Sequence, residues 1–471
     1  MHAVRAFARS SGPHSSDLCA SANRRLPDLI GAAVVLAALL WCAALATPAQ
    51  AQTQANWWES ITGSGAPDYS GRRRDSYNTQ PSSSYRDPVD DLRPDPTPWR
   101  SDEMIIAMQA AIDRYQHIVA NGGWPLVPPG RMMREGDDDD RVPILRRRLQ
   151  LSGDLRTRTP GYNTYTYDSV LADAVSRFQR RHGLRPTGRV ERSTYPVLNV
   201  TAEERLAQLR LNVGRIRDLL SQRVEERYIL VNIPAFQLEA VDSYEVQQRH
   251  RVIVGRTQRQ SPAIKATVRG LNFFPYWHVP DSVAHLDLIP RLQKEPDYLA
   301  KEKIRVLSSF GGAEVDPMTV DWSSPAAQQL KFRQDPGPQN ALGLVRIDMP
   351  NGENVYMHDT PMKTLFKQRS RAFSAGCVRV QDVFDLVDWI AAFEPGWHQG
   401  QANAIIEAGQ AVDVKLTRPV PVYFAYITAW AERSGNVEFR PDIYGRDGAV
   451  DRVAEMDRDP DDPPPPITLA P

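Results

Sequence analysis

The chain has 471 residues and carries 57 basic and 57 acidic side chains, so its formal net charge is zero. A neutral chain gives no electrostatic reason to expect a nucleic-acid partner, and 41% hydrophobic residues is ordinary for globular proteins. The length suggests about three domains, and we expect a monomer.

The N-terminus has the features of an export signal. Arg24 and Arg25 precede an apolar run over residues 29–46, and a small-x-small cleavage site ends at Ala51. The run is nearly long enough to cross a bilayer. Residues 1–51 are therefore either a cleaved signal peptide or a retained membrane anchor, and both place the chain in the periplasm or cell envelope. Residues 52–100 and 449–471 are polar and rich in proline, which predicts a disordered linker and a disordered tail.

Two amphipathic helices are predicted to form a helical scaffold, over residues 101–136 and 200–226. Ser101 can cap the first helix, whose apolar stripe runs from Ile105 to Val119. Thr201 and Glu204 form a capping box for the second, whose stripe runs from Leu206 to Leu220. We expect the two stripes to pack on each other.

The interval over residues 137–199 is predicted to be an inserted three-helix module. It begins with four consecutive aspartates (137–140), which cannot all face one metal ion and instead suit the N-terminus of the helix near Pro143. Further on, Phe178-Gln179 and the turn glycines Gly183 and Gly188 follow the spacing of the peptidoglycan-binding module found on many wall enzymes. The resemblance implies that this interval binds the wall glycan and its peptides.

Residues 227–448 are predicted to form a β-rich domain. Ile229, Val231 and Ile233 alternate as in a strand, and further strand-like runs follow as far as Tyr426. The charged insertion over residues 282–340 is expected to be a lid. We expect Trp322 and the stretch from Phe332 to Gly343 to cover the functional site of this β-rich domain.

Three cysteines are present, and only Cys377 lies beyond the export signal, after Cys19 and Cys42. A lone cysteine in an exported protein has no intramolecular disulfide partner. Upstream stands His358, a candidate base that could generate the thiolate. Gly376 allows a tight turn, which could bring its own N–H and that of Cys377 to an oxyanion.

This segment resembles the active-site signature of the L,D-transpeptidases, the family with a YkuD-type catalytic domain that cross-links peptidoglycan. Ser374, Gly376, Cys377 and Arg379 match the Ser/Thr-x-Gly-Cys-x-Arg/Asn motif. His358 stands where the family has its histidine, which a nearby backbone carbonyl orients. Many members have glycine where this chain has Asp359, so the role of that side chain is left open.

The resemblance implies an α+β multidomain protein: a β-rich catalytic domain with a lid, plus the scaffold and its module. It implies Cys377 as nucleophile and His358 as general base and acid, acting on tetrapeptide stems without metal or cofactor and giving 3→3 cross-links. Gly376, Ser374 and Asp359 would surround the reacting group. Arg379 would lower the pKa of the thiol, dock a substrate carboxylate or pair within the loop, and Tyr356 would line the pocket.

β-Lactams of the carbapenem type are the expected inhibitors. Two alternatives stay open: an L,D-carboxypeptidase or other wall cysteine hydrolase, and a peptidoglycan-binding protein without catalysis. The acceptor, which could be a stem, a lipoprotein or water, is also left open by the sequence.

Overall fold

The computed structural model describes residues 91–156, 165–221 and 225–448. The predicted signal or anchor, most of the predicted linker and the C-terminal tail lie outside the described residues. Among the described residues, no helix combines the length and the apolar character that a membrane span requires.

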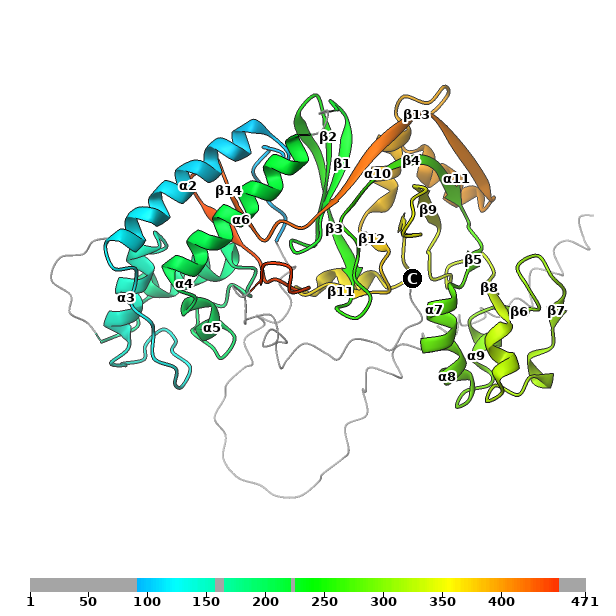
Figure 1. Ribbon diagram of the computed structural model, residues 1–471, viewed down its shortest axis with the longest axis horizontal. Helices are drawn as coiled ribbons and strands as arrows, with labels where there is room; N and C mark the ends of the chain where they lie inside the picture. Colours follow the sequence, from blue (N-terminus) through cyan, green and yellow to red (C-terminus); the bar gives the residue numbers. More distant parts are fainter. Residues whose placement is uncertain (1–90, 157–164, 222–224, 449–471) are drawn as a thin grey trace, which may run out of the picture. The chain divides into compact units, whose positions relative to one another are not determined.

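The two predicted scaffold helices are present and lie side by side (Figure 1). They are α2 (Asp102–Ala120) and α6 (Ala202–Leu220). The hydroxyl of Ser101 accepts the N–H of Met104 at 3.1 Å, and the capping box at the start of α6 is formed as predicted. Their apolar stripes share one hydrophobic cluster, so the prediction that they pack together is confirmed.

The interval between these helices has a hydrophobic core of its own. Its helices are α3 (Val142–Leu151), α4 (Ser169–Arg181) and α5 (Thr194–Leu198). The apolar residues Leu145 and Leu149 on α3 and Val175 and Phe178 on α4 are fully buried in this core, whereas Ile144 is only partly buried against it. The three-helix arrangement of the module is therefore as predicted.

The β-rich domain is built on a nine-stranded sheet that closes on itself. The strand order is β11-β3-β12-β10-β9-β4-β13-β1-β2, and β2 also pairs with β3, so only β11 stands outside the ring. The strands are β1 (Tyr228–Asn232), β2 (Gln237–Asp242), β3 (Glu245–Gly255), β4 (Ile264–Phe273), β9 (Val345–Asp348), β10 (Met357–His358), β11 (Ala372–Ser374), β12 (Val378–Val380) and β13 (Val412–Ala425).

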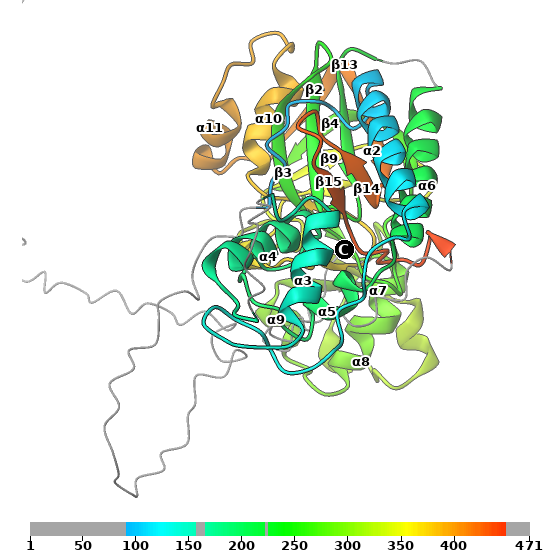
Figure 2. The same cartoon turned by 90° about the vertical axis from the view of Figure 1, so that its left-hand side faces the viewer.

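Helices cover this sheet on two sides. Figure 2 shows the strands between α2 and α6 on one side and α10 (Val383–Ala391) and α11 (Gln401–Ala408) on the other. Strand β1 is consequently buried along its whole length, and its apolar residues are consecutive rather than confined to alternate positions as predicted. Ile229 faces the core of the catalytic domain, and Leu230 faces the cluster formed with the scaffold helices.

The insertion before the catalytic segment is a small subdomain with its own core. It contains α7 (Asp281–Val283), the π-helix η2 (Ala284–Leu288), α8 (Ile289–Leu292), α9 (Tyr298–Lys301) and the 3₁₀ turns η3 (Pro317–Thr319) and η4 (Pro325–Gln329). Its sheet has the order β5-β8-β6-β7, with β5 (Trp277–His278), β6 (Ile304–Leu307), β7 (Glu314–Val315) and β8 (Lys331–Gln334).

The expectation that Trp322 covers the active site is wrong. Its ring packs on Phe332 inside the core of the insertion, with the ring centroids 6.1 Å apart. Both aromatic side chains are therefore used to hold the insertion together. The contact with the active-site segment comes instead from Tyr356 and Ala375, which pack against this core.

The predicted linker also ends earlier than the composition suggested. Residues 91–100 lie against the sheet, with Trp99 fully buried. The N–H of Trp99 donates to the carboxylate of Glu239 at 2.7 Å, and Asp91 forms an ion pair with Arg371 at 2.8 Å. One buried aromatic ring and these polar contacts outweigh the polar, proline-rich composition.

Beyond β13, the hairpin β14 (Ala429–Ala431) and β15 (Val437–Phe439) packs on the scaffold helices.

Candidate active site

Two short parallel strands bring the predicted histidine and cysteine segments together. On β10 and β12, Met357 lies opposite Val378 and His358 lies opposite Arg379. Opposed residues in a sheet face the same side, and neighbours along a strand alternate. Met357 and Val378 point into the core, so His358 and Arg379 point to the other face. Cys377 comes immediately before β12.

His358 is fully buried and held in one tautomer by the backbone. Its Nδ1 lies 2.5 Å from the carbonyl oxygen of Asp359. A carbonyl oxygen can only accept, so Nδ1 carries the proton and Nε2 keeps its lone pair in the neutral ring. Nε2 is buried and has no hydrogen-bond partner among the described residues. The ring therefore presents an unoccupied basic nitrogen, as a general base requires.

The backbone carbonyl of Asp359 orients the ring of His358, whereas the carboxylate of Asp359 holds a neighbouring loop. The carboxylate accepts the N–H of Leu344 at 3.0 Å and forms an ion pair with Lys363. Gly343 has a φ of +64°, and a Cβ there would lie 2.5 Å from Cγ of Asp359. The carboxylate thus fastens the loop before β9 to the histidine segment.

The loop before Cys377 is fixed by the hydroxyl of Ser374. This buried hydroxyl donates to the carbonyl of Cys377 at 2.5 Å and accepts the N–H of Gly376 at 3.1 Å. Gly376 has a φ of +129°, a region that other residues rarely occupy, so glycine is required there. We expected the N–H of Gly376 to donate to an oxyanion. This N–H is already bonded to the hydroxyl of Ser374, so that expectation is wrong. The N–H of Cys377 has no acceptor among the described residues.

The thiol and the imidazole are both neutral at rest. Burial raises the pKa of Cys377 to about 11, although hydrogen bonding from Tyr356 and the charge of Arg379 act in the opposite direction. Burial and the charge of Arg379 lower the pKa of His358 to about 3. The ring of Tyr356 lies edge-on to the imidazole, with centroids 5.7 Å apart.

Arg379 is a buried cation with spare donors. Its side chain is 1% exposed, and Nε and Nη2 have no hydrogen-bond partner in the part of the chain that the structure describes. Its Nη1 reaches only the sulfur of Met362, at 4.0 Å. Burial lowers the pKa of Arg379 to about 10, so it is charged at neutral pH. A buried guanidinium with free N–H groups is suited to an anionic group of a ligand.

No group of His, Cys, Asp and Glu in the described part of the chain is arranged to hold a metal ion. The acidic residues of the insertion are engaged elsewhere: Asp287 pairs with Arg256 and Arg259, and Asp281 pairs with Lys331.

Comparison with known families gives the class of the domain that carries this candidate site. Residues 226–421 match the model of the L,D-transpeptidase catalytic domain (YkuD), and residues 138–198 match a model described as "Putative peptidoglycan binding domain". The chain therefore contains an L,D-transpeptidase catalytic domain with a peptidoglycan-binding domain N-terminal to it.

One curated relative, from Haemophilus influenzae, is described as "Putative L,D-transpeptidase". It is 33% identical over 232 residues, which is 49% of this chain and 46% of the relative, so the match spans about half of each protein.

Two solved structures of L,D-transpeptidases are also similar, each at 12% identity. The one from Stackebrandtia nassauensis aligns over 66% of this chain and 99% of its own, with a TM-score of 0.23. L,D-transpeptidase 3 from Mycobacterium tuberculosis, in complex with a faropenem-derived adduct, aligns over 42% of this chain and 60% of its own, with a TM-score of 0.21.

Sequence analysis named the candidate catalytic residues, which stay a prediction, and it missed the residues that hold them in place. His358 lies opposite Arg379 on adjacent strands, and the ring of Tyr356 lies edge-on to that of His358. Tyr356 also hydrogen-bonds to Cys377. The partners of Asp359 are Lys363, four residues away, and the Leu344 N–H, and no motif marks either of them.

Proposed function

We propose that this chain is an L,D-transpeptidase that joins peptidoglycan stems by 3→3 cross-links through a thioester on Cys377. The observation that carries the proposal is the tautomer of His358. Its Nδ1–H is bonded to a carbonyl, and its Nε2 is buried and unpartnered. This is the form in which an imidazole can accept a thiol proton.

The first half-reaction forms the thioester. The sulfur of Cys377 attacks the carbonyl that joins a diamino acid to the terminal D-alanine of a tetrapeptide stem, and Nε2 of His358 takes the thiol proton. The tetrahedral intermediate then collapses, the C–N bond breaks, and His358 returns the proton to the nitrogen of the departing D-alanine. The negative charge that develops on the carbonyl oxygen requires an N–H donor, and the N–H of Cys377 is unoccupied.

The second half-reaction transfers the acyl group. The amine of a neighbouring stem attacks the thioester carbonyl and loses a proton to His358, and the C–S bond breaks to restore the thiol. One amide replaces another, so the exchange needs no nucleotide. A stem carboxylate docked on the spare N–H groups of Arg379 would hold the donor during both steps.

The domain arrangement supports peptidoglycan in the cell wall as the substrate. A peptidoglycan-binding domain on the same chain would keep the catalytic domain at the wall. We further propose that the chain acts in the periplasm or cell envelope, on the grounds of the apolar run and cleavage site before residue 52.

The test is mass analysis of muropeptides after incubation of the purified protein with defined tetrapeptide monomers. A transpeptidase gives 3→3 dimers and free D-alanine, and the Cys377→Ala variant gives neither. Tripeptide without dimer would identify a hydrolase that uses water as the acceptor. Unchanged tetrapeptide would identify a wall-binding protein without this catalysis.

A further inference from the structure

A residue outside the cysteine motif holds the peptide bond that precedes the nucleophile. The hydroxyl of Ser261 donates to the carbonyl oxygen of Gly376 at 2.7 Å and accepts the N–H of Gly255 at 2.9 Å. Ser261 is completely buried, so no exchange with bulk water competes with these bonds. The Gly376 carbonyl is thus fixed in direction.

Fixing that carbonyl also fixes the N–H of Cys377. The peptide unit between Gly376 and Cys377 is planar and, when trans, its N–H points away from its C=O. The hydroxyl of Ser261 holds the C=O on one side, so the N–H is aimed at the other. The neighbouring N–H of Gly376 is bonded to Ser374. Of these two donors, only the N–H of Cys377 is left for an oxyanion.

Ser261 is in turn held by a tyrosine near the end of the described chain. The phenol oxygen of Tyr444 accepts the N–H of Ser261 at 3.2 Å and donates to the carbonyl of Gly255 at 2.5 Å. A Cβ at Gly255 would lie 2.6 Å from the nitrogen of Ser261, so glycine is needed for this close approach. The end of β3, the loop after it and Tyr444 therefore interlock.

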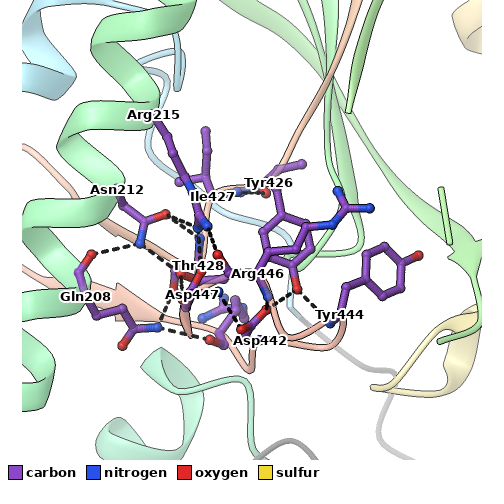
Figure 3. A network of polar contacts seen from close by, with 12 residues as sticks. Gln208, Asn212, Arg215, Tyr426, Ile427, Thr428, Asp442, Tyr444, Arg446 and Asp447 are labelled. Carbon is purple, nitrogen blue, oxygen red and sulfur yellow. Dashed lines mark hydrogen bonds and ion pairs between the residues drawn. The ribbon is translucent and has the colours of Figure 1, made fainter. Parts of the chain in front are cut away.

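Tyr444 belongs to a buried polar network, which Figure 3 shows from close by. Its N–H donates to the phenol oxygen of Tyr426 at 2.8 Å, and that phenol donates to Asp442 at 2.5 Å. The other carboxylate oxygen of Asp442 accepts the N–H of Asp447 at 2.7 Å. The turn that carries Tyr444 is thereby closed by hydrogen bonds at both ends.

The same network reaches the scaffold helix α6 (Figure 3). Thr428 donates its hydroxyl to Asp447 at 2.5 Å and its N–H to the side chain of Asn212 on α6 at 2.8 Å. Arg215, one turn further along α6, pairs with Asp447 at 2.5 Å. A continuous path of contacts thus runs from the scaffold helix to the peptide unit beside Cys377.

We propose that Ser261, held by Tyr444, is a positioning residue that aims the N–H of Cys377 at the oxyanion of the acyl-transfer reaction. The proposal rests on the proposed function, because only a reaction at a carbonyl generates that oxyanion. Ser261 does not touch the substrate. It acts through the orientation of one peptide bond.

The test compares two reactions of the same thiol. Opening of the strained β-lactam carbonyl of meropenem, a carbapenem, creates an oxyanion, whereas alkylation by iodoacetamide displaces iodide from carbon and creates none. In the full-length Ser261→Ala variant we expect the acylation rate of Cys377 to fall about 100-fold, toward the loss seen when an oxyanion donor is removed. The alkylation rate of Cys377 should stay within about twofold of the parent. Ser221→Ala, which removes an exposed hydroxyl at the end of α6, is the matched control and should change neither rate.

Two further variants test whether misfolding, rather than loss of the hydroxyl, slows acylation in Ser261→Ala. Ser261→Thr keeps a hydroxyl and should restore most of the acylation rate, and Tyr444→Phe should lower acylation without lowering alkylation. Equal losses in both reactions, or no loss in acylation, would overturn the proposal. A wild-type protein that is alkylated but never acylated would refute the proposed function itself, and this inference would fall with it.

Discussion

Replacing Gly343 by alanine tests whether the carboxylate of Asp359 holds the histidine in place. The added Cβ would lie 2.5 Å from Cγ of Asp359, a separation that real Cβ atoms essentially never show. The carboxylate has to move, and it then loses the N–H of Leu344. Since the carbonyl of the same Asp359 holds Nδ1 of His358, the shift should reach the base.

The matched control is Gly409, whose φ of +66° is almost the same as the +64° of Gly343 but whose surroundings are open. Alanine at either position has the left-handed strain, about 1–2 kcal/mol, partly offset by the stiffer unfolded chain. Gly343→Ala additionally loses a hydrogen bond to a charged group, about 1.5–3 kcal/mol. We therefore expect the free energy of unfolding to fall by about 2.5–4 kcal/mol for Gly343→Ala and by about 1 kcal/mol for Gly409→Ala.

The two effects are measured separately. Tryptophan fluorescence across a urea series gives the free energy of unfolding. Acylation by a carbapenem gives the catalytic effect, which we expect to be at least tenfold for Gly343→Ala and negligible for Gly409→Ala. If the two variants were equally stable and equally active, the carboxylate would have no role in holding the histidine segment.

Four other outcomes are expected. His358→Gln should keep the circular dichroism spectrum of the parent and acylate about 10²–10⁴-fold more slowly, and an unchanged rate would identify another base. Because burial lowers the pKa of His358 to about 3, kcat/KM for acylation should stay level as the pH falls from 8 to 5; a tenfold loss per unit below pH 6.5 would contradict this. Deleting residues 286–321 should shift product from dimer toward hydrolysed tripeptide, and an unchanged ratio would mean that the insertion does not exclude water. Replacing residues 140–199 by a Gly/Ser loop should weaken sedimentation with sacculi while acylation of Cys377 continues, and undiminished binding would place the wall contact elsewhere.

The module deletion has a structural consequence that the sequence does not reveal. His182 at the end of α4 stacks on Phe439 of β15, with centroids 5.3 Å apart, and Arg181 donates to the carbonyl of Val437 at 3.2 Å. Excision would uncover Phe439. A matched Phe439→Ser variant of the excised chain should recover any lost solubility, because it removes the newly exposed apolar ring.

Local signals in the sequence were sufficient to predict the helices and to choose the candidate catalytic residues. The caps at Ser101 and Thr201 and the apolar stripes behind them determine α2 and α6, because capping and periodicity are properties of neighbouring residues. Cys377 and His358 were found in the same way, from a motif and its spacing. These features need no knowledge of the rest of the fold.

Contacts between segments far apart in the sequence could not be predicted from local patterns. Trp99 looked like part of a polar linker, and only the folded chain shows that it is buried. Ser261 and Tyr444 are 183 residues apart, and nothing in either local sequence indicates that they meet. The prediction that Gly376 is an oxyanion donor was wrong for a similar reason. In the folded loop, its N–H donates to the hydroxyl of Ser374 instead.

The protonation states of the resting site explain why a buried thiol and a buried imidazole can serve this reaction. With both groups neutral, the site holds no separated charges between its nucleophile and base, which burial would make costly. The charge of Arg379 further disfavours the imidazolium. A stem carboxylate placed on the free N–H groups of Arg379 would cancel that effect, so His358 would become a stronger base when the donor is bound. The same charge lowers the pKa of the Cys377 thiol, so docking would also weaken the stabilisation of the thiolate. Arg379 therefore acts on both partners of the proton transfer, assisting the thiol and opposing the base.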